Sequence, residues 1–309
     1  MPRVSVIIPN YNHASFLSVR IDSILSQTFQ DFEVIILDDC SNDNSVEVIE
    51  KYRNNPKISK VIYNTTNSGS PFKQWKKGIE AASANLIWIA ESDDTAAPNF
   101  LEVLIKPFEI HSDLLISHCR SFRIDEKGNI KGLVTFANTG DNERWSKDYI
   151  VDGKSELKNY LKYRNTIPNA SAVVFKKPEN IDDVLRTDLK FSGDWLFWKE
   201  LLSKDGKIAH TSMPLNYFRT HSQTTRSFSN TAVAVDKEVK KFKEYRSFIS
   251  TVFVNPFDDR YRWMMEDWIH REEVFKNTSY YYRPVLHPSL TLRYYFYLLK
   301  RAIKNLTKR

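Results

Sequence analysis

Residues 86–94 of this chain read LIWIAESDD, an apolar run followed at once by acidic residues. The apolar part predicts a buried β-strand, and the acidic part marks the end of that strand. Carboxylates this close together repel one another, and burying them without a counter-charge costs several kcal/mol. A divalent cation relieves the repulsion, because hard cations bind carboxylate oxygens. We therefore expect a metal site at this strand end; the alternative is an acidic strand end that is simply solvated.

Strand and helix patterns alternate through the first part of the chain. Strands are predicted over residues 4–8, 32–37, 61–63 and 86–90, and helices over residues 14–27, 45–52 and 72–84. This alternation predicts βαβ units, and therefore an α/β fold with a mostly parallel central sheet flanked by helices. After about residue 230 the patterns are helical only, which places a domain boundary near that residue.

Composition predicts a soluble or peripheral protein of the cytoplasm. The chain has 309 residues, of which 41% are hydrophobic and 27% charged, enough for a sizeable core and about two domains. Its two cysteines, Cys40 and Cys119, cannot build a disulfide framework, which fits a reducing compartment. No secretory signal opens the sequence, and no apolar stretch reaches the roughly 18–20 residues of a membrane-spanning helix.

The net charge of +7 comes entirely from the last part of the chain. Residues 1–230 hold 29 Lys and Arg against 29 Asp and Glu, whereas residues 231–309 hold 16 against 9. Nucleic-acid binding requires basic groups spread over a footprint. The balanced first part therefore argues against a nucleic-acid partner and against a non-catalytic basic binding protein.

A second acidic pair, Asp38-Asp39, ends the strand predicted over residues 32–37. The carboxyl ends of parallel strands meet at one sheet edge, so this pair is expected to face the same cleft as residues 91–94. One pair can accept hydrogen bonds from a nucleobase or ribose, while the other holds a metal and with it a diphosphate. The chain contains neither GxxxxGK[ST] nor GxGxxG, which disfavours P-loop NTPases and nicotinamide dehydrogenases.

Four motifs in this order resemble the family 2 glycosyltransferases of the GT-A fold. They are VSVIIPNYN at residues 4–12, LDDCSND at 37–43, NSG at 67–69 and ESDD at 91–94. The resemblance covers about residues 3–225 and implies a GT-A catalytic domain over residues 1–230. Within it, a nucleotide-sugar half covers about 1–97 and an acceptor half about 98–230. Residues 231–309 then form a basic, aromatic helical extension.

The resemblance implies an inverting, metal-dependent glycosyltransferase that acts in cell-surface polysaccharide synthesis. It would move a sugar from a nucleotide-sugar donor, expected to be a UDP-sugar, to a hydroxyl of a glycan or lipid-linked acceptor. The alternative among enzymes is a sugar-nucleotide nucleotidyltransferase. Such enzymes generally need a glycine-rich amino-terminal loop for a triphosphate, and this chain lacks one.

The resemblance also implies roles for individual residues. The donor-binding candidates are Pro9, Tyr11, Asn12, Asp38, Asp39, Asn67, Gly69, Lys73 and Asp93. Among them, Tyr11 is expected against the base and Asp39 is expected to read it. The candidate ligands of Mn²⁺ or Mg²⁺ are Asp93, Asp94 and His221, although the motif leaves open which of Glu91, Asp93 and Asp94 binds the ion. Many relatives have an arginine where this chain has Lys73-Gln74-Trp75, and a lysine replaces it only as a point charge.

The catalytic base is expected at Asp194, in the stretch SGDWLFW of residues 192–198. This stretch resembles the family's acidic motif at the start of a helix, with Gly193 in place of the first acid. Asp194 would take the proton of the acceptor hydroxyl. The alternative is that Asp194 only caps the helix, where the helix dipole favours a carboxylate. Asn169, Ser171 and Trp195 are expected on the acceptor side.

The end of the chain combines tyrosines with positive charge, as in YYFY at residues 294–297 followed by Lys300 and Arg301. This composition suits a helix on an anionic membrane surface, with tyrosines at the interface and basic groups near the headgroups. Residues 289–309 would then make a peripheral contact with the inner face of the cytoplasmic membrane. The alternative is that these helices pack on the catalytic domain through their aromatic side chains.

Overall fold

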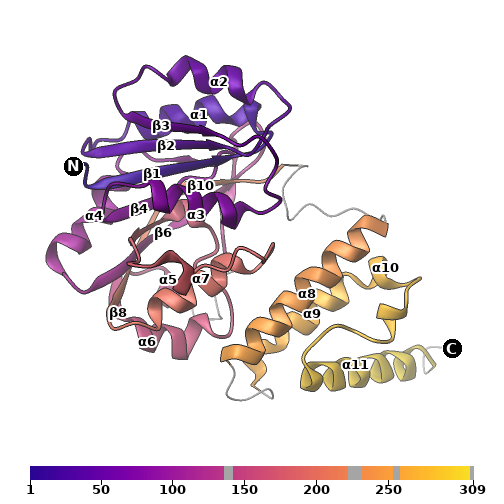
Figure 1. Ribbon diagram of the computed structural model, residues 1–309. Helices are drawn as coiled ribbons and strands as arrows, with labels where there is room; N and C mark the ends of the chain where they lie inside the picture. Colours follow the sequence, from indigo (N-terminus) through magenta and orange to yellow (C-terminus); the bar gives the residue numbers. More distant parts are fainter. Residues whose placement is uncertain (136–141, 222–231, 253–257, 307–309) are drawn as a thin grey trace. The chain divides into compact units, whose positions relative to one another are not determined.

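The computed structural model describes residues 1–135, 142–221, 232–252 and 258–306 (Figure 1). The chain divides into two compact units. The first, here called the sheet unit, comprises Met1–Leu161 and Asn165–Thr224; the second, here called the helical unit, comprises Lys162–Arg164 and Thr225–Arg309. The division of the first unit into a donor half and an acceptor half stays a prediction.

A ten-stranded sheet forms the centre of the sheet unit (Figure 1). Its strands are β1 (Val4–Asn10), β2 (Phe32–Asp38), β3 (Ile58–Tyr63), β4 (Leu86–Ile89), β5 (Thr95–Ala96), β6 (Leu114–Ile124), β7 (Ile130–Leu133), β8 (Tyr149–Asp152), β9 (Val173–Lys176) and β10 (Lys207–Arg219). The order is β3-β2-β1-β4-β9-β6-β10-β5, with β7 on β6 and β8 on β10. The first four strands in this order are parallel, whereas β9 runs antiparallel to both β4 and β6. The predicted α/β class is confirmed, and the reversed β9 makes the sheet mixed.

Helices cover both faces of this sheet. They are α1 (Ala14–Leu25), α2 (Ser45–Tyr52), α3 (Pro71–Ala81), α4 (Phe100–Ile110), α5 (Asn142–Trp145), α6 (Gly153–Glu156) and α7 (Gly193–Leu202), with short helical turns at Leu157–Leu161, Ala170–Ala172 and Ile181–Asp183. Alternate residues of β1 point to opposite faces, as strand geometry requires. Val6 joins the core made with α1, α2 and α4. Ile7 faces α3, where a side-chain carbon on Gly78 would lie 2.3 Å from Ile7 Cγ2, so only glycine allows this close packing.

Strand β10 is a long strand that joins two short sequence patterns. Residues 208–210 and 215–218 read by themselves as two short strands, and the structure joins them into 13 residues with register shifts around Pro214. Proline cannot donate to the ladder, so the strand bulges there and continues. Because β10 lies beside β6 and β5, its end brings Arg219 and His221 to the loop that follows β4.

Two buried histidines face each other where β10 pairs with β6. His118 and His210 are register partners, and their ring centroids lie 4.7 Å apart. Burial lowers the pKa of His210 to about 4, with Arg144 lowering it further and Asp148 opposing. Burial also lowers the pKa of His118 well below its ordinary value, and the charges of His210 and Arg144 add to this effect. Both rings are therefore neutral at pH 7.

Acid should unfold the sheet unit through this pair. A histidine whose pKa is lower in the folded than in the unfolded protein costs about 1.4 kcal/mol per pH unit between the two values. Stability should therefore fall as the pH drops from 6.5 toward 4. Urea unfolding of the His210→Phe variant at pH 7 and pH 5 should show a smaller difference than wild type. His111→Phe, on the same unit, serves as the control, and equal differences in all three proteins would contradict the explanation.

The helical unit contains α8 (Ala232–Val252), α9 (Arg262–His270), α10 (Glu272–Phe275) and α11 (Pro288–Leu306), with helical turns at Asp259–Tyr261 and Ser279–Tyr281. Its core is aromatic: Trp268 stacks on Phe275 at 4.2 Å between ring centroids, and Phe242 packs at 4.8 Å from Trp268. Lys162–Arg164 belongs to this core, because Trp263 Nε1 donates to the Tyr163 carbonyl at 2.8 Å. Within the described part of the chain, no helix has both the length and the apolar character needed to cross a bilayer.

Candidate active site

Strands β1, β2 and β4 end at one edge of the sheet, and the loops that follow them carry the acidic motifs. Asn10 pairs with Asp38 in the register of β1 and β2, and Ile7 pairs with Ile89 just before Glu91. Asn10 Nδ2 also donates to Asp38 Oδ1 at 2.7 Å. The expectation that both acidic pairs lie at one carboxyl edge agrees with this register.

Asp38 holds the loop after β2 in place. Its carboxylate accepts hydrogen bonds from Asn10 Nδ2 and Ser41 Oγ on one oxygen, and from the Ser41 backbone N–H on the other at 2.9 Å. Asn12 joins the same loop, because its N–H donates to Ser41 Oγ and its side-chain oxygen accepts from the Asn42 N–H. Asn12 and Cys40 both have positive φ, 56° and 61°. This left-handed backbone is costly for residues other than glycine and is maintained by the surrounding hydrogen bonds.

Asp39 binds the loop of residues 67–70. Asp39 Oδ1 accepts from Asn64 Nδ2, the Ser68 N–H and Gln74 Nε2, and Oδ2 accepts from Ser68 Oγ. Asn67 Nδ2 donates to the Asp39 carbonyl at 3.0 Å. Both carboxylate oxygens are thus engaged within the protein, so reading a base would require Asp39 to share or exchange these partners.

The remaining donor-side candidates are arranged around these two loops. Gly69 has φ of 71°, and its N–H donates to the Asn67 side-chain oxygen, which makes a tight turn. Exposed Lys73 donates to the Ser68 carbonyl at 3.1 Å. Pro9 is buried in β1, whereas Tyr11 is 46% exposed and leaves its ring available for stacking.

The carboxyl groups of the 91–94 loop have different surroundings. Glu91 accepts from Trp75 Nε1 at 2.9 Å, and desolvation followed by the charge of Asp93 raises its pKa to about 8. Asp94 is 1% exposed and accepts from the Arg219 N–H and Asn169 Nδ2. Burial and then Asp93 raise the pKa of Asp94 to about 6.

Asp93 is the carboxylate of this loop that the structure keeps ionised most strongly. Burial opposes its charge, but the hydrogen bond with His221 and the nearby His13 outweigh that effect and lower its pKa. His221 Nε2 lies 3.1 Å from Asp93 Oδ2. Asp93 therefore stays ionised to lower pH than its two acidic neighbours, and it lies close to two histidines.

Two arginines supply counter-charge to the acidic loop. Arg219 donates from Nε to the Asp93 carbonyl at 2.7 Å and from Nη1 to two further carbonyls. Arg20, on α1, is fully buried, with its guanidinium 4.9 Å from the centre of the Trp88 ring. None of its three guanidinium nitrogens has a hydrogen-bond partner among the described residues. Burial lowers the Arg20 pKa to about 10, and the attraction of Asp94, Asp93 and Glu91 opposes this effect.

His13, Asp93 and His221 form the one group among the described residues that can hold a metal ion. One ligand atom from each lies within 4.8 Å of the others. Two imidazole nitrogens and a carboxylate oxygen are suitable ligands for a divalent first-row metal, so the residues fit such an ion. Asp93 and His221 were predicted as ligands. Asp94 was also predicted, but the structure places it outside this group, hydrogen-bonded to Arg219 and Asn169.

His13 is the residue that sequence reasoning missed. It directly follows the PNYN motif of residues 9–12 and occupies the cap position of α1 without capping it through its side chain. Its Nδ1 lies 2.8 Å from Ser92 Oγ. A histidine beside a nucleotide-binding loop was the available signal, but its proximity to residues 92, 93 and 221 depends on the tertiary fold.

Asp194 lies in the first turn of α7 and is half-buried. Its Oδ2 accepts from Asn165 Nδ2 at 3.0 Å, and its Oδ1 lies 2.8 Å from the Trp195 N–H. The helix cap itself is Ser192. Gly193 has a packing reason to lack a side chain, because a Cβ there would lie 2.4 Å from the Phe72 ring.

The three residues predicted on the acceptor side are buried and form hydrogen bonds within the protein. Ser171 is buried, its hydroxyl accepts from the Glu91 N–H, and its carbonyl accepts from Trp88 Nε1. Asn169 holds Asp94. Trp195 is 1% exposed and donates to the Leu161 carbonyl at 2.6 Å, so its ring lies in the core and not on an open surface.

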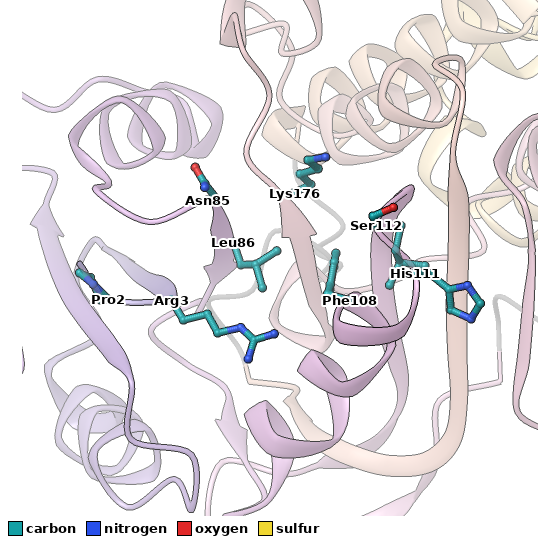
Figure 2. A pocket seen from close by; sticks show the side chains of 9 residues that line it. Pro2, Arg3, Asn85, Leu86, Phe108, His111, Ser112 and Lys176 are labelled. Carbon is teal, nitrogen blue, oxygen red and sulfur yellow. The ribbon is translucent and has the colours of Figure 1, made fainter.

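A separate hollow of about 280 Å³ lies at the opposite edge of the sheet. Figure 2 shows the side chains of Arg3, Leu86, Phe108 and Lys176 around it. Arg3 precedes β1 and Leu86 opens β4, and these strands are parallel. The hollow is therefore on the amino side of the strands, away from the acidic loops.

The fold and the site together define an α/β protein with acidic residues and histidines gathered at the carboxyl edge of its sheet. The model of the family described as "Glycosyl transferase family 2" matches residues 5–170, more than half of the chain. The chain therefore belongs to glycosyl transferase family 2, as its motifs predicted. Membership in this family favours a glycosyltransferase over a nucleotidyltransferase or a non-catalytic basic binding protein.

Known relatives are similar to parts of this chain. The poly(ribitol-phosphate) β-N-acetylglucosaminyltransferase TarS of Staphylococcus aureus is 35% identical over 225 residues, which cover 71% of this chain and 36% of TarS. A cholesterol galactosyltransferase of Borreliella burgdorferi is 28% identical over 244 residues, which cover 76% of this chain and 64% of that protein. The chain thus spans about a third of one relative and just under two thirds of the other.

Solved structures confirm the predicted GT-A fold. TarS residues 1–349 in complex with UDP-GlcNAc superpose with a TM-score of 0.61 at 19% identity, covering 95% of this chain and 89% of that one. A mannosyltransferase of Pyrobaculum calidifontis in complex with GDP-Man and Mn²⁺ gives a TM-score of 0.57 at 14% identity, covering 98% and 75%.

Removing Arg20 should destabilise the sheet unit strongly, because the acidic loop loses a buried counter-charge. We expect Arg20→Met to lower the free energy of unfolding by about 3–5 kcal/mol. Arg53→Met is the matched control, since Arg53 makes an exposed ion pair with Glu50, which contributes little to stability. Urea unfolding of the two variants measures the difference, and a similar small loss in both would contradict a role for Arg20 as counter-charge.

Proposed function

We propose that this chain is an inverting, metal-dependent glycosyltransferase that uses a nucleotide-sugar donor. The acceptor would be a hydroxyl of a glycan or a lipid-linked sugar, in the synthesis of a cell-surface polysaccharide. The observation that supports this best is the group of Asp93, His13 and His221, at the same sheet edge as the Asp38-Asp39 loop. A diphosphate needs a cation at such an edge, because the chain has no P-loop to bind phosphates.

The donor proposed is a UDP-sugar. The structural neighbour TarS is described in complex with UDP and with UDP-GlcNAc. In this chain the exposed Tyr11 ring and the Asp38-Asp39 loop would receive the nucleoside, with Asn12, Asn67 and Gly69 shaping the loops around it. Lys73 is an exposed cation in the first turn of α3 and would add charge for the phosphates.

A divalent metal, Mn²⁺ or Mg²⁺, is proposed at Asp93 and His221. When bound, it would neutralise the charge that develops on the leaving diphosphate. Asp94 and Glu91 would contribute indirectly, because their hydrogen bonds with Arg219, Asn169 and Trp75 hold the loop in place. The mannosyltransferase neighbour described with GDP-Man and Mn²⁺ supports this type of cofactor.

Asp194 is proposed as the general base. Asn165 and the amino end of α7 favour its charged form, and its partial exposure leaves it accessible to an acceptor. The carboxylate would take the proton of the acceptor hydroxyl as that oxygen bonds to the anomeric carbon. The bond from that carbon to the diphosphate breaks at the same time, so the nucleoside diphosphate leaves and the configuration inverts.

Replacing the base should remove turnover without removing donor binding. We expect Asp194→Asn to lower kcat by about 10²–10⁴-fold, because the amide cannot accept the proton. Asp205→Asn is the control, since Asp205 is an exposed partner of Lys154. UDP binding by calorimetry should match wild type in both variants. Turnover near wild type in Asp194→Asn would exclude this residue as the base.

Helix α11 supports the proposed peripheral contact with a membrane. Leu292, Tyr295, Phe296, Leu299 and Ile303 are 43–58% exposed and are spaced to lie on one helix face. Leu290 and Tyr294 are buried in the helical unit and anchor the other side. The last 36 residues contain eight Lys and Arg and no acidic residue.

Charge favours an anionic lipid surface over a second copy of the chain. A twofold interface brings the same surface of each copy together, so basic groups would face basic groups. Apolar side chains flanked by lysines and arginines instead match the boundary between acyl chains and anionic headgroups. We place this contact at the inner face of the cytoplasmic membrane, where a lipid-linked acceptor would be found.

Vesicle flotation tests this contact. The full chain should float with phosphatidylglycerol-containing vesicles and much less with pure phosphatidylcholine, and the double variant Phe296→Gln/Leu299→Gln should lose flotation. Ile150→Gln/Met213→Gln removes two similarly exposed apolar side chains elsewhere and should float as wild type. Equal flotation of all three proteins would overturn the membrane contact. A lipid-independent dimer that the α11 variant abolishes would assign the face to a second copy instead.

A further inference from the structure

Hydrogen bonds made by the residues on either side of His13 in the sequence place its ring at the acidic loop. The Ala14 N–H donates to Asp43 Oδ2 at 2.9 Å, and the preceding Asn12 has a left-handed backbone and binds Ser41 and Asn42. These contacts fix the start of α1 against the loop after β2. The side chain of His13 makes no cap of its own helix, so the helix does not need an imidazole at this position.

Two contacts of the His13 ring lie toward the proposed metal site, and a third is with Phe16 on its own helix, at 6.1 Å between ring centroids. Nδ1 is 2.8 Å from Ser92 Oγ, and the ring meets the His221 ring edge to face at 5.3 Å between centroids. One ligand atom each from His13, Asp93 and His221 lies within 4.8 Å of the others. Small side-chain rotations would bring these atoms onto a single ion. A hydrogen bond to one ring nitrogen is the usual way in which a metal-binding histidine is oriented.

Oxygen ligands are scarce at this position. Both oxygens of Asp94 accept hydrogen bonds from the protein, and Glu91 Oε1 accepts from Trp75 Nε1. Asp93 is the carboxylate of this loop that lies together with the two imidazoles. Mg²⁺ prefers an octahedron of oxygens, whereas imidazole nitrogens favour transition ions.

We propose that His13 is a third protein ligand of the metal, and that this second imidazole makes the site prefer Mn²⁺ over Mg²⁺. The assignment rests on the proposed function only in that a donor diphosphate would fill further coordination positions. The competing explanation is that His13 merely packs between Ser92 and His221. A ligand and a packing residue differ in whether a ring nitrogen bonds to the ion.

Electron paramagnetic resonance on the full chain separates these explanations, with Mn²⁺ alone as the probe. Loss of the free Mn²⁺ signal measures affinity, and pulsed measurements detect the nitrogens bonded to the ion. Wild type should show two coordinated histidine nitrogens, and Mg²⁺ should displace Mn²⁺ only at an excess of about tenfold or more. His13→Gln should show one nitrogen and bind Mn²⁺ more weakly by at least about 10–100-fold, the loss that follows removal of a group that only orients a ligand. His13→Asp, which restores an oxygen ligand, should narrow the difference between Mn²⁺ and Mg²⁺.

Two controls make the outcome decisive. His270→Gln changes an exposed histidine of the helical unit and should leave Mn²⁺ binding as in wild type. Circular dichroism confirms that each variant is folded, and His13→Asp provides the test if His13→Gln is not. Wild-type affinity and two nitrogens in a folded His13 variant would overturn the assignment, as would equal competition by Mg²⁺ in wild type.

A parallel titration with UDP separates this inference from the proposed function. If Mn²⁺ binding depends on His13 but UDP does not bind the Mn²⁺-loaded wild type, the donor proposal fails and the ligand assignment stands. If UDP and Mn²⁺ bind His13→Gln as well as wild type, the ligand assignment fails and the donor proposal stands.

Discussion

The charge of Asp93 and Asp94 lies in a region with little water, and the surrounding residues balance or hold that charge. A buried carboxylate without a partner costs several kcal/mol. Here Asp94 accepts hydrogen bonds from Arg219 and Asn169, the buried Arg20 attracts the carboxylates of the loop, and Asp93 lies with His13 and His221. These partners come from α1, the turn at residues 169–172 and the end of β10. Compensation of this charge thus brings into proximity segments that are more than 120 residues apart in the sequence.

The same constraint explains why several polar residues lie below the surface. Ser171 and Asn169 hold the backbone of Glu91 and the side chain of Asp94, and Trp75 holds the Glu91 carboxyl. On the neighbouring loop Asp39 satisfies the N–H and hydroxyl of Ser68. Ser171 and Asp39 pair backbone N–H groups of these loops, whereas Asn169 and Trp75 hold their carboxylates. A rigid edge of this kind suits a site that must present charge to a diphosphate in a defined position.

Much of the fold could be predicted from periodicity and motifs. The strands at residues 4–8, 32–37 and 86–90 are mostly apolar runs, and each lies in the parallel part of the sheet. The reversed β9 and the joining of β10 across Pro214 could not be read in this way. A four-residue apolar strand carries no sign of its direction, and a proline inside a run normally indicates an interruption. Asp93 and His221 were expected near one ion. Trp195 was expected on the acceptor side and lies in the core. An aromatic residue beside an acidic motif gives the same sequence pattern whether it contacts an acceptor or packs in the core.

The sequence by itself determined the family, the α/β class and the acidic motifs, because these depend on local order and short-range spacing. The tertiary structure decided how the acidic residues differ: Asp94 is enclosed, Glu91 holds its proton to higher pH, and Asp93 stays ionised beside two histidines. Those differences arise from desolvation and from partners at positions 13, 20, 169, 219 and 221, which no local pattern brings together. Proximity across the sheet edge therefore assigns separate chemical roles to neighbouring carboxylates.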